Sequence, residues 1–348
     1  MKNRLKGPEG LERLEKALGV DLSAQKPVLK TYKWATTPYY LDLARKRNLL
    51  EDPIGQQVIP SPFETKDTSR NSSPDPLREQ SYSPVPGLIH RYRDRVLILA
   101  SSVCASYCRH CNRKRTWRSP EALSIGEKGL GRLTDYISKR PHIREVLISG
   151  GDPLLLPLNH LERLLGAIRA ISTVKVIRIG SRVPVVLPMK ITGRLCRLLK
   201  RFRPLWLNTH FNHPSEITRR AKAAIEKIQL SGIPVSNQTV LLKGINDRYE
   251  TLHDLFCALQ EIMVRPYYLF QCDHVKGTGH FRTDLHVGIS IMERLWGDTG
   301  GMCIPRFVAD LPDGKGKARL MPSQLLEYEN KVAVFRTFDN RLVKIKTD

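Results

Sequence analysis

The chain has 348 residues, of which 41% are hydrophobic and 26% charged, the proportions of an ordinary soluble protein with one barrel-sized domain and an appendage. It contains no apolar run of about 18 residues, and its first residues lack the apolar segment of a signal peptide, so we expect a cytoplasmic protein that does not enter membranes. Seven cysteines, an odd number, argue against a disulfide framework and favour a reducing compartment.

The net charge of +23 is the one bulk property that is typical of nucleic-acid binding. The Arg and Lys residues are, however, scattered along helix-like segments, and there is no RNP or zinc-finger pattern. We interpret most of the charge as solvated helix faces and do not expect a nucleic-acid partner. Anionic ligands would account for a local share of it.

The chain divides into an irregular first quarter and a regular remainder. Residues 1–87 contain one expected helix, at 9–18, among turn-rich pieces, and we interpret them as an extension wrapped on the main domain. From Arg95 onward, short apolar runs alternate with amphipathic segments of helical period. The expected strands are 96–100, 145–149, 175–180, 205–209, 234–240 and 266–271, and the expected helices are 125–139, 160–171, 191–202, 216–230, 249–263 and 285–296. Six strand–helix units predict a parallel α/β sheet covered by helices, either open or curved into a partial barrel.

Three cysteines form a CxxxCxxC run directly after the strand expected at 96–100: Cys104, Cys108 and Cys111. Three thiolates on one loop can hold three irons of a 4Fe–4S cluster and leave the fourth iron free to bind a ligand. A zinc ribbon would need four ligands, and no fourth cysteine lies nearby. The alternative is three buried structural cysteines, which the polar loop and the basic run 113–115 disfavour.

Polar residues also follow the other expected strands. For any one of them, a polar turn or a core histidine is the simpler explanation. Because the carboxyl ends of parallel strands meet at one face, their recurrence predicts a shared site. These residues are Cys104, Gly150, Gly151, Asp152, Ser181, Arg182, His210, Asn212, Asn237, Gln238 and Asp273.

The cluster run, extended to the string CRHCNRKR, resembles the radical S-adenosylmethionine (SAM) superfamily and, within it, the lysine 2,3-aminomutase family. The resemblance runs from about Leu77 to the C-terminus. It implies a partial (β/α)6 radical SAM barrel at 88–284, after the N-terminal extension 1–87, and a C-terminal segment 285–348 that binds pyridoxal phosphate (PLP) and closes the barrel. It also implies that the free iron chelates SAM, and that an electron from a donor such as flavodoxin or ferredoxin cleaves SAM to a 5′-deoxyadenosyl radical.

Paired glycines allow a ligand to approach the backbone closely, although two glycines alone are a weak signal. By resemblance to the superfamily's GGE-like motif, Gly150, Gly151 and Asp152 hold the methionyl amino group of SAM. The same resemblance places four further residues near SAM: Ser181, Arg182, His210 and Gln238.

Taken without the family resemblance, the stretch His90–Arg95 would be interpreted as a solvated turn, although the guanidinium groups of its arginines are suited to binding phosphate oxygens. The resemblance assigns Arg91, Tyr92 and Arg95 to the PLP phosphate. It also matches residues 310–317 to the family's Asp-x-Pro-Gly-rich-Lys motif, whose lysine lies seven residues after the aspartate. That spacing selects Lys317 as the catalytic PLP lysine.

The glycine run of this motif is interrupted at Asp313 and Lys315, so Lys315 is a rival to Lys317.

Asp273 and Asp310 match the positions that bind the ε-ammonium of lysine in the family. Two carboxylates offset the desolvation of a cation and repel a glutamate side chain. For Asp273 alone, a loop carboxylate is an equally good explanation.

Arg113 matches the arginine that binds the substrate carboxylate in the family.

The longer clostridial-type aminomutases bind a structural zinc through a loop cysteine and a C-terminal cysteine cluster. Here Arg248 takes the loop position and no CxC or CxxC follows, so we predict no zinc, and whether the chain forms a homo-oligomer stays open.

The predicted function is that of an isomerase: a radical SAM, PLP-dependent 2,3-aminomutase that converts L-lysine to β-lysine. The substrate could instead be arginine or another basic amino acid. The short length resembles the branch that supplies β-lysine for the modification of elongation factor P. If the chain is not an enzyme, the alternative is an iron–sulfur protein that binds nucleic acid or has a regulatory role.

Overall fold

A single nine-stranded sheet organises the molecule, as the computed structural model shows for the residues that it describes, 3–44, 48–67, 71–118 and 125–347. The strand order is β11-β10-β9-β8-β7-β6-β5-β4-β3. Strands β4 to β10 run parallel, while β3 and β11 are antiparallel additions at the two edges. The strands are β3 (Leu88–Tyr92), β4 (Arg95–Ser101), β5 (Glu145–Gly150), β6 (Val176–Gly180), β7 (Leu205–Thr209), β8 (Val235–Leu241), β9 (Arg265–Gln271), β10 (Arg306–Asp310) and β11 (Lys317–Arg319).

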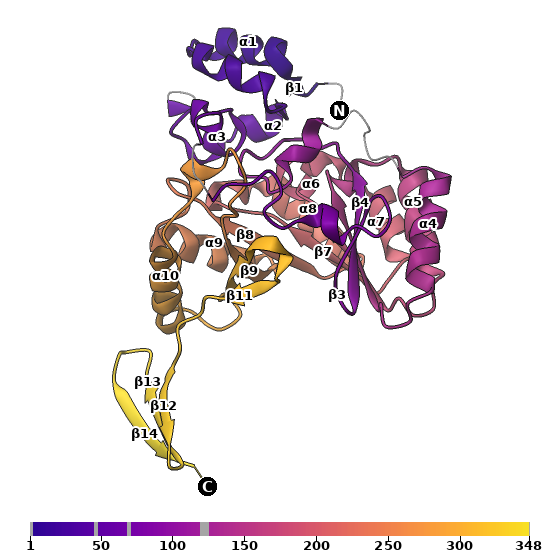
Figure 1. Cartoon of the computed structure of the whole chain (residues 1–348). Helices are drawn as coiled ribbons and strands as arrows, with labels where there is room; N and C mark the ends of the chain where they lie inside the picture. Colours follow the sequence, from indigo (N-terminus) through magenta and orange to yellow (C-terminus); the bar gives the residue numbers. More distant parts are fainter. Residues whose placement is uncertain (1–2, 45–47, 68–70, 119–124, 348) are drawn as a thin grey trace.

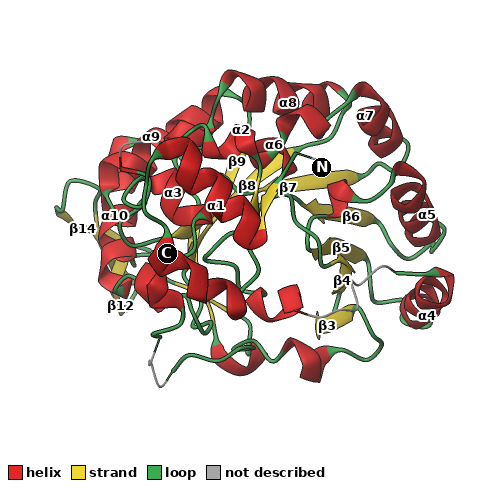
Figure 2. Cartoon of the chain, turned by 90° about the horizontal axis from the view of Figure 1, so that it is seen from above, coloured by secondary structure: helices red, strands yellow, loops and turns green. Residues whose placement is uncertain are grey.

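Helices cover the outer face of the curved sheet, and Figure 2 shows them as a ring around the strands. Because β3 and β11 end the sheet without pairing to each other, the barrel is partial, as predicted. Apolar residues three or four apart put one helix face into the core, as fully buried Leu161, Leu165 and Ile168 show. The helices are α4 (Glu127–Ser138), α5 (Leu158–Arg169), α6 (Val183–Val186), α7 (Gly193–Lys200), α8 (Arg219–Leu230), α9 (Tyr249–Glu261) and α10 (Leu285–Asp298).

All six expected strands and six expected helices are confirmed, with ends that shift by a few residues. Three strands of the sheet were not predicted. The stretch expected as a turn at 90–95 belongs to a β3–β4 hairpin, and β10 and β11 carry the sheet beyond residue 284. The apolar run of β10, Phe307–Ala309, is too short to be recognised from periodicity alone.

The N-terminal extension packs over the barrel end that carries the cluster loop, and α1 and α3 lie over the strands in Figure 2. It contains α1 (Gly7–Leu18), α2 (Pro38–Leu41), α3 (Pro53–Val58) and the pair β1 (Leu5–Lys6) and β2 (Ala35–Thr36). The backbone N–H of Tyr107 donates to Ala35 O at 2.9 Å, and that of Arg109 donates to Gln57 O at 2.8 Å. The extension therefore holds the cluster loop through backbone hydrogen bonds.

The C-terminus forms a separate antiparallel meander that projects away from the barrel (Figure 1). It consists of β12 (Leu325–Glu329), β13 (Val332–Arg336) and β14 (Leu342–Lys346). None of these strands contributes to the large cavity described below. In the part of the chain that the structure describes, no helix is long and apolar enough to cross a bilayer.

Candidate active site

A cavity of about 780 Å³ occupies the interior of the partial barrel. It brings together every residue that the sequence assigned to the cluster, SAM, PLP or the substrate. The residues are Arg91, Tyr92, Arg95, Cys104, Cys108, Cys111, Arg113, Gly150, Gly151, Asp152, Ser181, Arg182, His210, Gln238, Asp273, Asp310 and Lys317. Residues up to 226 positions apart in the chain thus face one space (317 minus 91): most follow the carboxyl ends of parallel strands, whereas Arg91, Tyr92, Arg95 and Lys317 come from the two edges of the sheet.

The three cysteines lie on the loop after β4, at one end of this cavity. Burial raises the pKa of Cys104 and raises that of Cys111 to about 11. Among the described residues, no group of three His, Cys, Asp or Glu side chains is arranged to hold a single metal ion. A 4Fe–4S cluster takes one thiolate per iron, so its cysteines are spaced around a cluster rather than one ion, and bound iron favours the thiolate form.

Two glycines let the end of β5 lie directly against the cluster loop. Gly150 has a φ of +109°, and a Cβ there would lie 2.5 Å from Ser101 O. A Cβ on Gly151 would lie 2.5 Å from the backbone N and O of Val103. The close approach of two backbones therefore accounts for this Gly–Gly pair.

The carboxylate of Asp152 holds the loop after β6. Its Oδ1 accepts a hydrogen bond from Ser181 Oγ at 2.7 Å, and its Oδ2 accepts one from the Arg182 backbone N–H at 2.8 Å. Burial raises the pKa of Asp152 to about 6, although these hydrogen bonds act in the opposite direction. Asp152 lines the cavity, but its oxygens are engaged by the protein itself.

Arg182 connects the cluster loop to the extension. Its Nη1 donates to Cys108 Sγ at 2.7 Å, and its Nη2 donates to Gln57 Oε1 at 2.5 Å and Glu216 Oε1 at 2.6 Å. Nearby His210 is neutral because burial lowers its pKa to about 4. Sequence reasoning missed Gln57 and Glu216, which are distant in the chain and belong to no recognisable motif.

The β3–β4 hairpin carries the three residues predicted to bind the PLP phosphate. Arg91 donates from Nη2 to Leu77 O at 2.8 Å, while its buried Nε has no hydrogen-bond partner in the described part of the chain. The Arg95 guanidinium lies 4.5 Å from the centre of the Tyr92 ring. Two guanidinium groups and a free N–H donor fit an anionic phosphate.

Lys317 begins strand β11, and its Nζ donates to Asp310 Oδ1 at 2.6 Å. The two residues are paired across the antiparallel β10–β11 ladder, which fixes this contact. The ammonium group also lies 5.2 Å from the centre of the Phe270 ring. Lys315, the rival candidate, is not among the residues that line the cavity.

Asp273 follows β9 and shares this end of the cavity with Asp310. Burial and repulsion from Asp310 raise the pKa of Asp273 to about 7, although a hydrogen bond from Asn112 and the charges of Lys317 and Arg113 lower it. Two carboxylates thus lie close together, and Lys317 pairs with one of them, Asp310. Such a pair gains stability from an added cation.

Comparison with known proteins agrees with this geometry. Residues 98–256 match the family model of the radical SAM superfamily, and residues 292–345 match that of lysine-2,3-aminomutase. The chain is 44% identical to the L-lysine 2,3-aminomutase of Fusobacterium nucleatum over 97% of its own length and 79% of that protein's, and 42% identical to that of Clostridium subterminale over 97% and 81%. The chain belongs to the lysine 2,3-aminomutase family of radical SAM enzymes.

The family also contains a glutamate 2,3-aminomutase, from Clostridioides difficile, which is 37% identical over the whole of this chain and 82% of that protein. Because it belongs to this family of radical SAM enzymes, the chain whose structure is described above is an isomerase that uses SAM and a 4Fe–4S cluster. Its three loop cysteines suit that cluster, because they leave one iron open for SAM. Family membership alone leaves the amino-acid substrate open.

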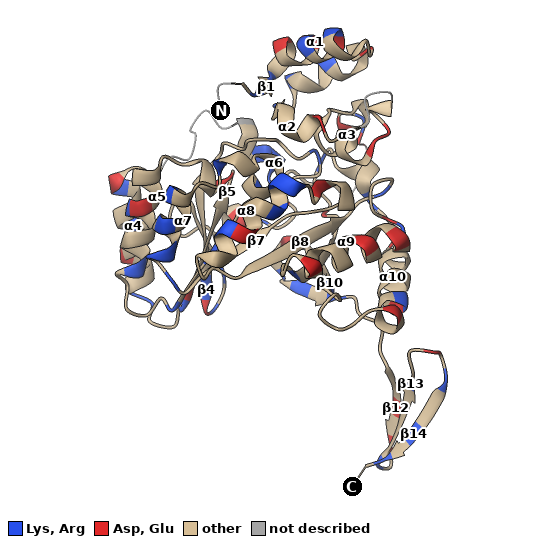
Figure 3. Ribbon diagram, turned by 180° about the vertical axis from the view of Figure 1, so that it is seen from behind, with Lys and Arg blue, Asp and Glu red and all other residues tan. Residues whose placement is uncertain are grey.

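The basic residues of this aminomutase are spread over several separate outer elements rather than one, as the ribbon colouring of Figure 3 shows. Helix α7 carries Arg194, Arg197 and Lys200, and α8 begins with Arg219 and Arg220. This distribution of basic residues is the one expected for charges on solvated helix faces.

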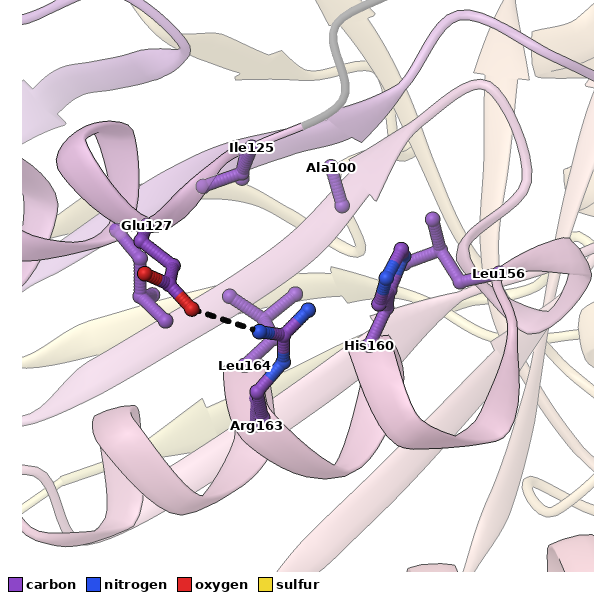
Figure 4. Close-up of a pocket in the computed structure, with 8 residues that line it drawn as sticks. Ala100, Ile125, Glu127, Leu156, His160, Arg163 and Leu164 are labelled. Carbon is purple, nitrogen blue, oxygen red and sulfur yellow. Dashed lines mark hydrogen bonds and ion pairs between the residues drawn. The ribbon is translucent and has the colours of Figure 1, made fainter.

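A second hollow, of about 50 Å³, lies between α4, α5 and β4 (Figure 4). At its edge, Arg163 Nη1 pairs with Glu127 Oε1 at 3.1 Å. The remaining lining is mostly apolar, and the space suits one or two water molecules. It offers no arrangement of groups for chemistry.

Proposed function

We propose that this aminomutase moves the α-amino group of L-lysine to C3, giving β-lysine, with PLP as a second cofactor. The observation that carries the proposal is the pair Asp273 and Asp310 beside Lys317. When the side chain of Lys317 holds PLP, Lys317 no longer presents an ammonium group to Asp310. Both carboxylates then need another cation, and the ε-ammonium of a substrate lysine supplies it.

The charge of this end of the cavity separates the two substrates known in the family. A glutamate side chain would bring a third carboxylate beside Asp273 and Asp310. Because like charges at close range in a buried site repel strongly, glutamate would bind poorly. A lysine side chain instead converts the repulsion between the two aspartates into two favourable ion pairs.

The residues that would hold PLP are Lys317 and the hairpin residues Arg91, Tyr92 and Arg95. The unpartnered Nε of Arg91 supports this assignment, because a buried N–H without a partner costs about 1–3 kcal/mol and a phosphate oxygen would satisfy it. When bound, PLP stabilises the migrating amino group, and SAM on the cluster supplies the radical that takes a hydrogen atom from the substrate.

The remaining task of the protein is positioning. Arg113, near the cluster end, would bind the substrate carboxylate, and the two aspartates would bind the opposite end of the substrate. Holding both ends fixes the carbon chain between them, so that one hydrogen atom faces the radical. The position of the site inside the partial barrel would also limit the access of water and other hydrogen donors.

The test is a substrate panel with anaerobically reconstituted enzyme, SAM, PLP and a reductant. L-Lysine, L-arginine and L-glutamate are supplied separately, and the products are separated by chromatography. We expect β-lysine from L-lysine and no product from L-glutamate. Turnover of arginine without turnover of lysine would replace the substrate, and turnover of glutamate would overturn the role of Asp273 and Asp310.

A further inference from the structure

Glu79 is a buried carboxylate of the extension that contacts the arginine predicted to bind the substrate. It begins the short 3-10 turn Glu79–Tyr82 and lines the cavity. Arg113 Nε lies 3.1 Å from both carboxylate oxygens of Glu79, and Arg113 Nη2 donates to Oε1 at 2.7 Å. The contact is a multiple, charge-assisted one, and such contacts fix the orientation of a guanidinium group.

The position of this contact on the guanidinium leaves a second edge open. A guanidinium can bind one carboxylate through Nε and Nη2 and another through Nη1 and Nη2. Glu79 occupies the first edge. In the described part of the chain, Nη1 of Arg113 has no hydrogen-bond partner, so the second edge is available to a ligand in the cavity.

A competing carboxylate lies close by. Asp273 accepts a hydrogen bond from the side chain of Asn112, the neighbour of Arg113 in the chain, and Asp273 and Arg113 line the same cavity. If Glu79 did not hold Arg113, the guanidinium could turn toward Asp273 and pair with it. That pairing would remove both the donor for the substrate carboxylate and the acceptor for the substrate ammonium.

Glu79 is itself fixed from two sides. Arg115 Nη2 donates to Glu79 Oε2 at 2.6 Å and pairs with Asp75 Oδ1 at 3.3 Å. Burial alone would raise the pKa of Glu79, but the charges of Arg113 and Arg115 outweigh it and lower the pKa to about 2. Glu79 therefore stays ionised in any ordinary buffer.

The segment that carries Glu79 is also tied to the loop of the PLP lysine. The backbone N–H of Asp313 donates to Pro76 O at 2.9 Å, and Arg78 Nε pairs with Asp313 Oδ1 at 2.6 Å. Tyr82 OH donates to Asp313 O at 3.3 Å. One short segment thus contacts both the substrate arginine and the lysine loop.

We propose that Glu79 is a positioning residue that holds Arg113 away from Asp273 and turns its open edge toward the substrate carboxylate. The proposal rests on the proposed function, because it assigns Arg113 and Asp273 to opposite ends of one substrate. It adds a residue from outside the barrel to the determinants of substrate binding. Glu79 acts through Arg113 and touches no reacting atom.

The experiment compares two ligands of PLP-loaded enzyme without SAM, where no turnover occurs. L-Lysine has both a carboxylate and a terminal ammonium, whereas 1,5-diaminopentane lacks the carboxylate. Binding is measured by titration calorimetry for the wild type and for Glu79→Gln, which keeps the shape and removes the charge. We expect the variant to weaken lysine binding about 10- to 100-fold and to change diamine binding far less.

Equal weakening for both ligands, or no weakening for lysine, would overturn the proposal. Glu79→Asp keeps the charge with a shorter reach and should restore part of the lysine affinity. The matched control is Glu64→Gln, since Glu64 is another buried carboxylate of the extension that pairs with two cations, Arg109 and Lys114, but does not line the cavity. We expect this control to affect both ligands alike.

A crystal structure of ligand-free Glu79→Gln separates this proposal from the proposed function. We expect the Arg113 guanidinium to turn toward Asp273 in the variant. An Arg113 that keeps its wild-type position would overturn the positioning role of Glu79. If the wild-type enzyme bound neither lysine nor the diamine, the proposed function would fail, while this structure would still decide where Glu79 holds Arg113.

Discussion

The two ends of the active-site cavity are built in opposite ways. Around the cluster loop, buried charges have several partners: Glu64, which lies outside the cavity lining, binds Arg109 and Lys114, and Arg182 binds Glu216 and the Cys108 thiol. At the lysine end, Lys317 pairs with Asp310, whereas Asp273 is repelled by Asp310 and has no ion pair among the described residues, although the charges of Lys317 and Arg113 act on it. Balanced charges indicate a fixed scaffold, whereas unbalanced charges indicate where a ligand completes the site.

The cluster end gives the largest expected effect. Replacement of Cys111 by Ser removes one iron ligand, so iron content should fall and aminomutase activity should drop by about a thousandfold or more. Iron analysis and electron paramagnetic resonance measure the cluster directly. The control is Cys196→Ser on α7, a buried cysteine away from the cavity, which should retain iron. Full cluster occupancy in Cys111→Ser would contradict the assignment.

At the lysine end, Lys317→Ala should lower activity by about 100-fold or more, because PLP then has no lysine to hold it. The visible spectrum of PLP should revert to that of the free aldehyde, and dialysis should remove the cofactor. Lys315→Ala is the control, since Lys315 is not among the residues that line the cavity, and we expect near-normal PLP binding. The opposite result for the two lysines would make Lys315 the PLP lysine.

Asp273→Asn tests whether the unbalanced charges serve binding at the expense of stability. The variant should lose about 2–4 kcal/mol of lysine binding, because one anion facing the ammonium is gone. Since the folded pKa of Asp273 is raised to about 7, ionising it opposes folding fully above pH 7 and progressively less as the pH falls toward 4.

We therefore expect Asp273→Asn to be more stable than the wild type by up to about 4 kcal/mol at pH 8, with a gain that shrinks toward pH 4. Urea unfolding at several pH values measures this difference. A variant that is less stable than the wild type at pH 8 would show that Asp273 is a structural residue.

The smallest expected effect concerns the interrupted glycine run. Asp313 has a φ of +60° and pairs with Arg78, and both side chains are substantially exposed. Asp313→Gly removes a surface ion pair but also relieves an unfavourable backbone conformation, so stability should change by only about 0.5 kcal/mol. Activity should stay within about twofold of the wild type. A tenfold loss of activity would show that the Arg78–Asp313 pair orients the lysine loop.

Much of the site could be predicted because periodicity located six parallel strands, and the residues after them converge by topology. Cys104, Gly150, His210 and Asp273 were found in this way, and the family motif added Lys317. Glu79 and Glu216 were not found, because their partners, Arg113 and Arg182, lie 34 residues away in the chain and no local pattern marks either pair. The contacts that position functional side chains depend on packing between distant segments.

The most direct test of the account is the pH dependence of the preference for L-lysine over L-norleucine, which has the same six-carbon chain but no terminal ammonium. Binding of both is measured between pH 6 and pH 9 in PLP-loaded enzyme without SAM. Because the pKa of Asp273 is about 7, we expect the preference for lysine to rise across that pH, and to be weak and nearly constant in Asp273→Asn. Equal binding of the two amino acids, or a preference that does not change with pH in the wild type, would contradict a lysine end built to receive a cation.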